Sequence, residues 1–212
     1  TIYRHIWSNK AAGGDLYTHL RRQGKRYYRR GSGKGSRGHI RNRVSIDDRP
    51  PIVESNTEVG HWEIDTVIGK GHSGALVTIV ERKTKMTLAS RVNSKSADDV
   101  TKATINLLEP YKHIVKTITA DNGKEFAGHE KIAKKLDAQV YFAHPYSSWE
   151  RGLNENTNGL IRQYFPKVTD FKKVSQAAVL EVIGRLNRRP RKCLGFKTPN
   201  EALCDYYDAK AA

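Results

Sequence analysis

The stretch His61-Trp62-Glu63-Ile64-Asp65-Thr66-Val67-Ile68 decides the fold, because its β-branched residues and alternating faces are typical of a strand. Ile64, Thr66 and Ile68 fall on one face, and Glu63, Asp65 and Val67 fall on the other. Residues 75–81 and 86–92 have the same strand-like character. Glycines separate the first run from the second, and residues 82–85 can form a tight turn. We therefore predict two consecutive hairpins at the start of the domain.

Helical and strand-like segments alternate after these hairpins. Ser96 is suited to cap a helix that Pro110 ends, and Thr198 to cap the last helix. Further segments follow in this order: a strand over 113–119, a helix over 126–136, a strand over 139–143, a helix opened by a Ser147–Glu150 capping box and a helix over 174–186. The helix that follows the capping box would bury a stripe of Leu153, Thr157, Leu160 and Tyr164. The order β-β-β-α-β-α-β-α-α-α predicts an α/β fold: a mixed five-stranded sheet, three antiparallel strands plus two parallel, flanked by helices. Right-handed crossovers would place the fourth strand beside the first.

The charge of the chain is high and uneven. Its 212 residues contain 38 Lys and Arg against 22 Asp and Glu, a net charge of +16. Residues 1–50 alone contribute 13 basic against 3 acidic residues, a net of +10. We predict three parts, namely an N-terminal remnant over 1–20, a basic flexible linker over 21–53 and a folded core domain over 54–212. The composition favours a nucleic-acid partner, although a ribosomal or chromatin protein would have the same balance.

The cellular compartment of the protein is indicated by its cysteines and by its lack of long apolar runs. Cys193 and Cys204 fit buried thiols of a reducing compartment. No stretch approaches the length of a membrane span, and no signal peptide is evident. We expect a cytoplasmic, nucleoid-associated protein with no membrane partner. Because the chain begins at Thr1 and its only methionine is Met86, we also expect a missing upstream part.

Three acidic residues, Asp65, Asp121 and Glu155, each stand inside a distinctive motif. The motifs cover Gly60–Asp65, Asp121–Phe126 and Trp149–Leu160. Each has an ordinary explanation by itself: an edge strand with a solvated acidic face, an Asp-Asn-Gly turn, and a solvated polar helix face. Together they favour a metal site, because the predicted crossovers bring Asp65 and Asp121 together. Carboxylates are ligands that suit Mg²⁺ or Mn²⁺, and two such ions can bracket one phosphate.

Other side chains are candidates for DNA contacts. The linker has basic pairs, and the loop and helix around Glu155 combine basic, amide and aromatic groups. The predicted DNA-binding residues are Arg21, Arg22, Lys25, Arg26, Arg29, Arg30, Lys124, His144, Tyr146, Arg151, Asn154, Asn158 and Arg162. A disordered, solvated tail is the alternative for the linker, and a core anchor is the alternative for the neighbouring Trp149. We find neither the Arg/His/Arg set of a tyrosine recombinase nor a His-hydrophobic-His nickase motif.

The chain resembles the insertion-sequence 30 family of bacterial DDE transposases. The resemblance covers roughly residues 54–205 and rests on the three acidic motifs together with four further segments. These segments are Val77–Thr84, Tyr141–Trp149, Arg162–Lys167 and Leu186–Lys192. One departure is Ile64, where the family usually has glycine, and it changes the packing beside Asp65.

The resemblance implies an RNase H-like core in which Asp65, Asp121 and Glu155 are the catalytic and metal-binding residues. It also implies a Mg²⁺-dependent or Mn²⁺-dependent enzyme, with two ions, that binds double-stranded DNA as a homodimer or higher oligomer. The expected DNA partners are terminal inverted repeats and target DNA, and residues 1–7 resemble the tail of an upstream helix-turn-helix module. Two alternatives stay open, an RNase H-type nuclease without strand transfer and a domesticated DNA-binding protein without catalysis.

Overall fold

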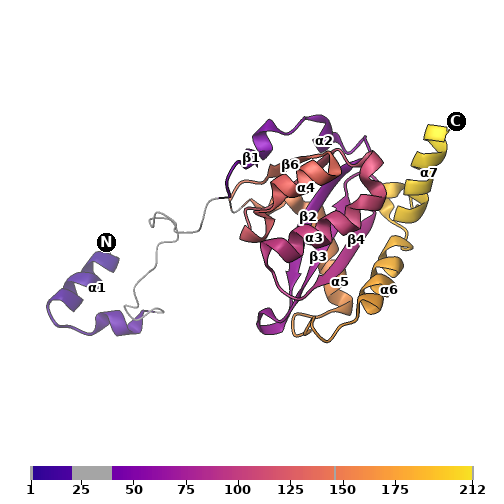
Figure 1. Cartoon of the computed structure of the whole chain (residues 1–212). Coiled ribbons are helices and arrows are strands. Elements are labelled where there is room, and N and C mark those ends of the chain that lie inside the picture. Colours follow the sequence, from indigo (N-terminus) through magenta and orange to yellow (C-terminus); the bar gives the residue numbers. More distant parts are fainter. Residues whose placement is uncertain (1, 21–39, 146, 212) are drawn as a thin grey trace. The chain divides into compact units, whose positions relative to one another are not determined.

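The computed structural model describes residues 2–20, 40–145 and 147–211 of the chain. They belong to two compact units, residues 1–38 and residues 39–212 (Figure 1). The first unit contains the helix α1 (Ile2–Ala11) and the short 3-10 helix η1 (Leu16–His19), neither of which buries a side chain. The six basic residues predicted as the DNA-binding part of the linker, Arg21 to Arg30, lie outside the described residues.

The second unit is built on one mixed sheet with the strand order β1-β6-β5-β2-β3-β4. Strands β2, β3 and β4 are antiparallel neighbours, whereas β1, β6, β5 and β2 run parallel. The strands are β1 (Val44–Ser45), β2 (His61–Ile68), β3 (Ala75–Glu81), β4 (Thr87–Val92), β5 (Thr117–Ala120) and β6 (Gln139–Phe142). The predicted hairpins and the mixed sheet are confirmed. The sheet also has a sixth strand, β1, which we did not predict. A strand of two residues is too short to leave an alternating pattern in the sequence.

Residues 40–53 pack on this sheet, although we predicted them as part of the linker. Ile40 and Val53 are buried, and β1 extends the parallel edge. Arg49 is also buried, donates a 2.9 Å hydrogen bond to Thr119 Oγ1 and forms an ion pair with Glu54. The linker prediction is therefore wrong for 40–53. In a polar stretch of sequence, a buried arginine that is held by hydrogen bonds cannot be told apart from an exposed one.

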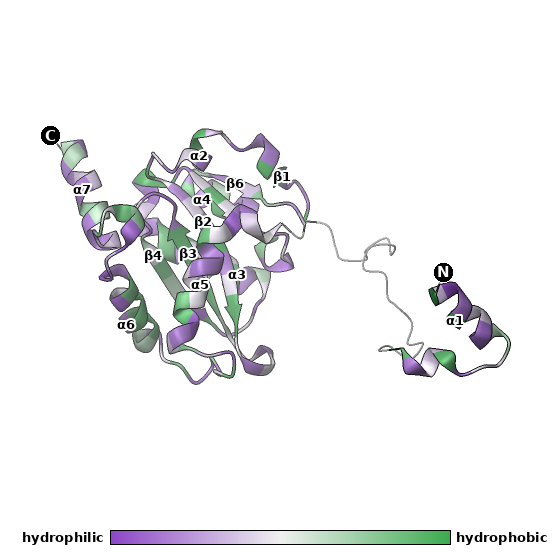
Figure 2. Cartoon of the chain, turned by 180° about the vertical axis from the view of Figure 1, so that it is seen from behind, coloured by the Kyte–Doolittle hydropathy of each residue, from purple (hydrophilic) through white to green (hydrophobic). Residues whose placement is uncertain are grey.

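Helices cover both faces of the sheet (Figure 1). Figure 2, seen from behind, shows α5 and α6 on the face opposite α3, and these helices contact β2, β3 and β4. The helices are α2 (Ile52–Ser55), α3 (Ala97–Leu108), α4 (His129–Leu136), α5 (Gly152–Tyr164), α6 (Gln176–Asn187) and α7 (Pro199–Ala211). None of the described helices is long and apolar enough to cross a membrane.

The caps that the sequence predicted are present at two of three helices. Ser96 Oγ accepts the N–H of Asp99, and Thr198 forms a reciprocal capping box with Glu201. The predicted box between Ser147 and Glu150 is absent, because Ser147 makes no side-chain cap. The Glu150 carboxylate instead accepts the N–H of His144.

Two hydrophobic cores lie on opposite faces of the sheet, and β2 contributes to both. Trp62 and Ile64 belong to the core beneath α3 and α4, whereas Val67 belongs to the core beneath α5 and α6. Strand β2 lies between β5 and β3, so the alternative of an edge strand for Asp65 is wrong. By alternation, Asp65 lies on the same face of the sheet as Val67, beneath α5.

Two predictions about burial are wrong. Cys193 and Cys204 are both exposed thiols, not buried ones. In α5 we predicted a buried stripe of Leu153, Thr157, Leu160 and Tyr164, but the fully buried residues are Asn154, Thr157 and Ile161. The helix presents a partly polar face to the sheet, and apolar periodicity alone does not identify such a face.

Candidate active site

Asp65 and Asp121 come together because β2 and β5 are parallel neighbours. The register of the two strands pairs Glu63 with Thr119. Continuing it by two residues places Asp121, which directly follows β5, opposite Asp65. The carboxyl ends of parallel strands therefore bring two acidic residues to one point, as the predicted crossovers required.

The two oxygens of Asp121 have different roles. Oδ1 accepts a 2.8 Å hydrogen bond from the N–H of Gly123, which forms the predicted Asp-Asn-Gly turn. Oδ2 lies 3.5 Å from Nη2 of Arg151. The next residue, Asn122, donates to the Ala143 carbonyl and accepts from Arg43, so that it ties the end of β5 to the end of β6. The turn and the site are thus compatible functions of one motif.

Arg151 lies between the two aspartates. Its Nη1 is 3.6 Å from Asp65 Oδ2, and its Nη2 is 3.5 Å from Asp121 Oδ2. The side chain of Arg151 is only 11% exposed, and its Nε is buried without a hydrogen-bond partner within the described residues. One guanidinium therefore provides the positive charge that two adjacent carboxylates need.

Asp65 has further partners on both sides. Its Oδ1 accepts the N–H of Thr66 at 2.8 Å, and its Oδ2 accepts Nδ2 of Asn158 at 3.0 Å. Thr78 donates to Oδ1 of Asn158 at 2.9 Å, which directs the amide nitrogen toward the aspartate. Burial raises the pKa of the Asp65 carboxyl, Arg151 opposes that shift, and the neighbouring Asp121 carboxylate adds to it.

Glu155 is the third predicted acid, and it does not join the aspartates directly. It lies in the first turn of α5 and is exposed. Positions 155 and 158 are three residues apart in α5 and share one side of the helix. Glu155 therefore lies on the side of Asn158, which contacts Asp65. Within the described residues, no three acidic, histidine or cysteine side chains are close enough together to hold a metal ion.

A buried ion pair that the sequence analysis missed fixes α5 against β2. Glu63 is 1% exposed and accepts a 3.0 Å hydrogen bond from the N–H of Asn154. Its other oxygen accepts Nη1 of Arg82 at 2.5 Å. Burial raises the pKa of Glu63, while the Arg82 charge opposes this shift. The sequence did contain a signal for a second buried acid, because Glu63 is two residues before Asp65 and therefore on the same face of the strand.

A second missed residue is Glu125, on the other face of β2. It is buried, accepts a hydrogen bond from Thr66 Oγ1 at 3.2 Å and forms a 2.6 Å ion pair with Lys95. It therefore holds the residue that follows Asp65. Its position inside the Asp121–Phe126 motif was the signal for such a role.

The remaining predicted contact residues have diverse surroundings. Lys124 is exposed, whereas Asn154 is fully buried and is not accessible to DNA in this arrangement. His144 forms ion pairs with Asp47 and Glu150. Arg162 donates a 2.7 Å hydrogen bond to the carbonyl of Ile68. Tyr146, also predicted to contact DNA, lies outside the described residues.

Trp149, for which we had considered a core position, is 73% exposed, so that alternative is wrong. Its ring lines a cavity of about 410 Å³ at the beginning of α5. The other residues that line this cavity are Glu54, Asn56, Glu63, Arg82, Lys85, Glu150, Gly152 and Leu153.

The geometry of the two aspartates suits a divalent cation, because both already bind one cationic group. Both direct a hard carboxylate oxygen at one point, and that point already attracts a cationic group, the Arg151 guanidinium. Glu155, on the same side of α5, is the residue available to complete the set. A metal ion at Asp65 and Asp121 would require Arg151 to withdraw.

This sheet, with acidic residues at the ends of two parallel strands and a polar helix across them, defines an RNase H-like core. The catalytic core domain of BIV integrase has the same fold, with a TM-score of 0.55 and 21% identity over 72% of this chain and 99% of that domain. Residues 56–148 match the integrase core domain family.

Two curated proteins of similar sequence are transposases of insertion sequences. The chain is 53% identical over 201 residues to the transposase for insertion sequence element IS4351 of Bacteroides fragilis, which covers 95% of this chain and 62% of that protein. It is 40% identical over 209 residues to transposase InsI for insertion sequence element IS30A of Escherichia coli, covering 96% of this chain and 54% of that protein. Over nearly its whole length the chain is similar to these insertion-sequence transposases, and it spans between half and two thirds of their own length.

Proposed function

We propose that this chain is the catalytic part of a DNA transposase that cleaves DNA strands by metal-dependent hydrolysis and joins the freed 3′-OH ends to target DNA. The observation that carries the proposal is the convergence of Asp65 and Asp121 on one cationic group beneath α5. In this proposal Asp65, Asp121 and Glu155 are the catalytic residues. Terminal inverted repeats, target DNA and a second copy of the protein are its partners.

Asp65, Asp121 and Glu155 are also the residues that would hold Mg²⁺ or Mn²⁺, with two ions as the expected number. When bound, such ions activate the attacking oxygen and stabilise the leaving oxygen of a phosphodiester. The chain itself provides the fixed strand ends, the position of α5 and the surrounding basic groups. No protein nucleophile is required, because water is the attacking group in the cleavage step.

The chemistry has two balanced steps. In the first, a water oxygen forms a bond to phosphorus and the P–O3′ bond breaks, which leaves a 5′-phosphate and a free 3′-OH. In the second, that 3′-OH forms a bond to a target phosphorus, and the target 3′ oxygen leaves as a new hydroxyl. Arg151, displaced from between the aspartates, is positioned to contact the phosphate oxygens, since its guanidinium matches them in geometry.

The test is cleavage and joining with conservative variants. Asp65→Asn, Asp121→Asn and Glu155→Gln should each abolish cleavage of oligonucleotide DNA in Mg²⁺ or Mn²⁺ while DNA binding is retained. Asp208→Asn, an exposed position on α7, is the matched control and should behave as wild type. A variant that cleaves at the wild-type rate would remove its residue from the catalytic set.

A target plasmid in the same reaction separates the alternatives. Joined product supports transposition. Cleavage without joining would favour an RNase H-type nuclease, and DNA binding without cleavage would favour a domesticated binding protein.

A further inference from the structure

The segment between α6 and α7, residues 188–197, is strongly basic, and we refer to it as the basic loop. It contains five Lys and Arg residues and no Asp or Glu. Lys197 pairs with Asp205 at 2.6 Å. Arg188, Arg189 and Lys192 are exposed and form no ion pair within the described part of the chain. The loop therefore concentrates positive charge that the protein itself leaves uncompensated.

Arg191 adds to this imbalance from inside the loop. It is half-buried, donates a 3.3 Å hydrogen bond to the carbonyl of Leu186, and its Nε is buried with no partner among the described residues. Burial lowers its pKa, and the nearby positive charge of Arg189 lowers it further. Two arginines thus lie close enough to repel each other, a local arrangement that an anion would stabilise.

The basic loop is closed by its own backbone, so its surface is preformed. The N–H of Arg191 donates to the Lys197 carbonyl at 3.0 Å, and the N–H of Phe196 donates to the Arg191 carbonyl at 2.9 Å. Lys192–Leu194 form a 3-10 turn that ends at Gly195, whose φ is +62°. A closed loop loses little conformational entropy when it binds a partner.

Phe196 projects from this closed loop into solvent. Its side chain is 71% exposed, and its φ is +68°, a conformation that is unfavourable for a bulky residue. Both the exposed ring and the left-handed backbone cost free energy. Backbone strain at an exposed aromatic residue is a reason to ask whether that residue has a function.

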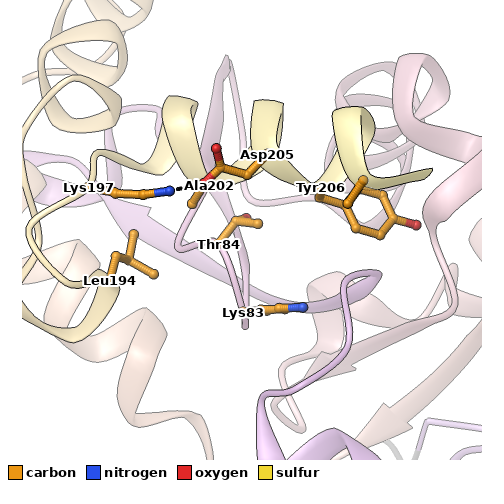
Figure 3. Close-up of a pocket in the computed structure, with 8 residues that line it drawn as sticks. Lys83, Thr84, Leu194, Lys197, Ala202, Asp205 and Tyr206 are labelled. Atoms are coloured by element: carbon orange, nitrogen blue, oxygen red, sulfur yellow. Dashed lines mark hydrogen bonds and ion pairs between the residues drawn. The ribbon is translucent and has the colours of Figure 1, made fainter. Parts of the chain in front are cut away.

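The β3–β4 turn lies between the basic loop and the cavity at the start of α5. A cavity of about 410 Å³ is lined by Lys83 and Thr84 of this turn together with Leu194 and Lys197 of the loop (Figure 3). Arg82 and Lys85 of the same turn line the cavity that contains Glu63 and Trp149. One turn therefore connects the basic loop with the wall of the candidate active site.

We propose that the basic loop is a second DNA-binding surface, in which Arg188, Arg189 and Lys192 contact phosphates and Phe196 packs against a base step. The partner is duplex DNA that continues past the candidate active site, so this inference rests on the proposed function. Phosphates match the uncompensated charges. An apolar ring on a basic surface is suited to wedge against a base step of bent DNA.

The first test neutralises the phosphate contacts. Binding of the triple variant Arg188→Gln, Arg189→Gln, Lys192→Gln to a non-specific duplex is measured across a KCl series without divalent metal. The log–log salt slope should become shallower by about 2 to 3, since each lost phosphate contact removes about 0.9. A control triple variant, Lys112→Gln, Lys131→Gln, Lys134→Gln, removes the same charge from exposed positions around α4 and should leave the slope nearly unchanged.

The second test concerns the ring. Phe196→Gly relieves the left-handed backbone, so it should keep or raise the Tm while weakening duplex affinity several-fold. Phe196→Leu, which retains an apolar side chain, should weaken affinity less. Unchanged affinity in Phe196→Gly would show that the ring does not contact DNA.

Two outcomes would overturn the proposal as a whole. Equal salt slopes for both triple variants would mean that the basic loop has no special role. A shift of the first triple variant from dimer to monomer in sedimentation, with an unchanged salt slope, would assign the surface to a second copy of the chain. Both assays measure binding without metal, so they give an answer even if the chain does not cleave DNA.

Discussion

The guanidinium of Arg151 lies 3.6 Å from the Asp65 carboxylate and 3.5 Å from that of Asp121. It therefore occupies the position at which the two acids direct their negative charge. A metal ion and this guanidinium cannot both stay there, because two cations would be forced into close contact. The relationship makes Arg151 a counter-ion of the metal-free site and a competitor of the metal.

Replacing Arg151 by glutamine should reveal the competition between arginine and metal as a change in thermal stability. In EDTA the two aspartates lose their counter-charge, so we expect a loss of about 1 kcal/mol, or roughly 2–4 °C in Tm. Added Mg²⁺ should raise the Tm of Arg151→Gln more than that of the wild type. Thermal unfolding with and without Mg²⁺ measures both effects. Arg151→Lys keeps the charge and is the control, and an equal Mg²⁺ effect on the Arg151→Gln variant and the wild type would contradict the competition.

Glu63 offers a stability prediction with an internal control. Its carboxylate is buried between Arg82 and the N–H of Asn154, so Glu63→Gln leaves an arginine without its buried partner. We expect a loss of about 3 kcal/mol in urea unfolding. Glu54→Gln removes an acid that pairs with both Arg82 and Arg49, but that acid is 66% exposed, so its loss should cost less than the loss of Glu63. Equal losses for the two variants would show that burial does not decide the contribution.

Much of the candidate site followed from the sequence, because strand order determines which residues become neighbours. The predicted crossovers placed the strand before Asp121 beside the strand of Asp65, and the register of β2 and β5 agrees. Local alternation also placed Asp65 and Glu63 on one face. These inferences need only chain direction and periodicity, which a sequence contains.

Other parts of the site could not be predicted, because they depend on side-chain geometry. Arg151 was expected to contact DNA, and nothing in the pattern indicated that it would bridge two aspartates. Asn154 was also expected to contact DNA but is fully buried, and its N–H donates to Glu63 of β2. Buried polar pairs of this kind look identical to exposed ones in a sequence.

Asn187 should contribute to stability far from the site. Its side chain accepts the N–H of Thr87 at 3.0 Å and donates to the carbonyl of the same residue at 2.8 Å. Asn187→Ala leaves two buried backbone groups of β4 without partners, so we expect a loss of about 2–3 kcal/mol in urea unfolding. Arg185→Gln breaks only an exposed pair with Glu181 on the same helix and should cost less than about 0.5 kcal/mol. A loss below about 1 kcal/mol for Asn187→Ala would mean that water replaces the side chain.

His144 should make stability depend on pH. Hydrogen bonds to Glu150 and Asp47 raise the pKa of the imidazole above its ordinary value near 6.5. Because the folded-state pKa is the higher one, the stabilisation is fully present below about pH 6.5 and is lost as the pH rises through the raised value. The Tm difference between wild type and His144→Gln should therefore be largest near pH 6 and shrink toward pH 9. His72→Gln, at an exposed histidine without an ion pair among the described residues, should show no such trend. A difference that stays constant between pH 6 and pH 9 would mean that the His144 charge does not hold residues 47 and 150 together.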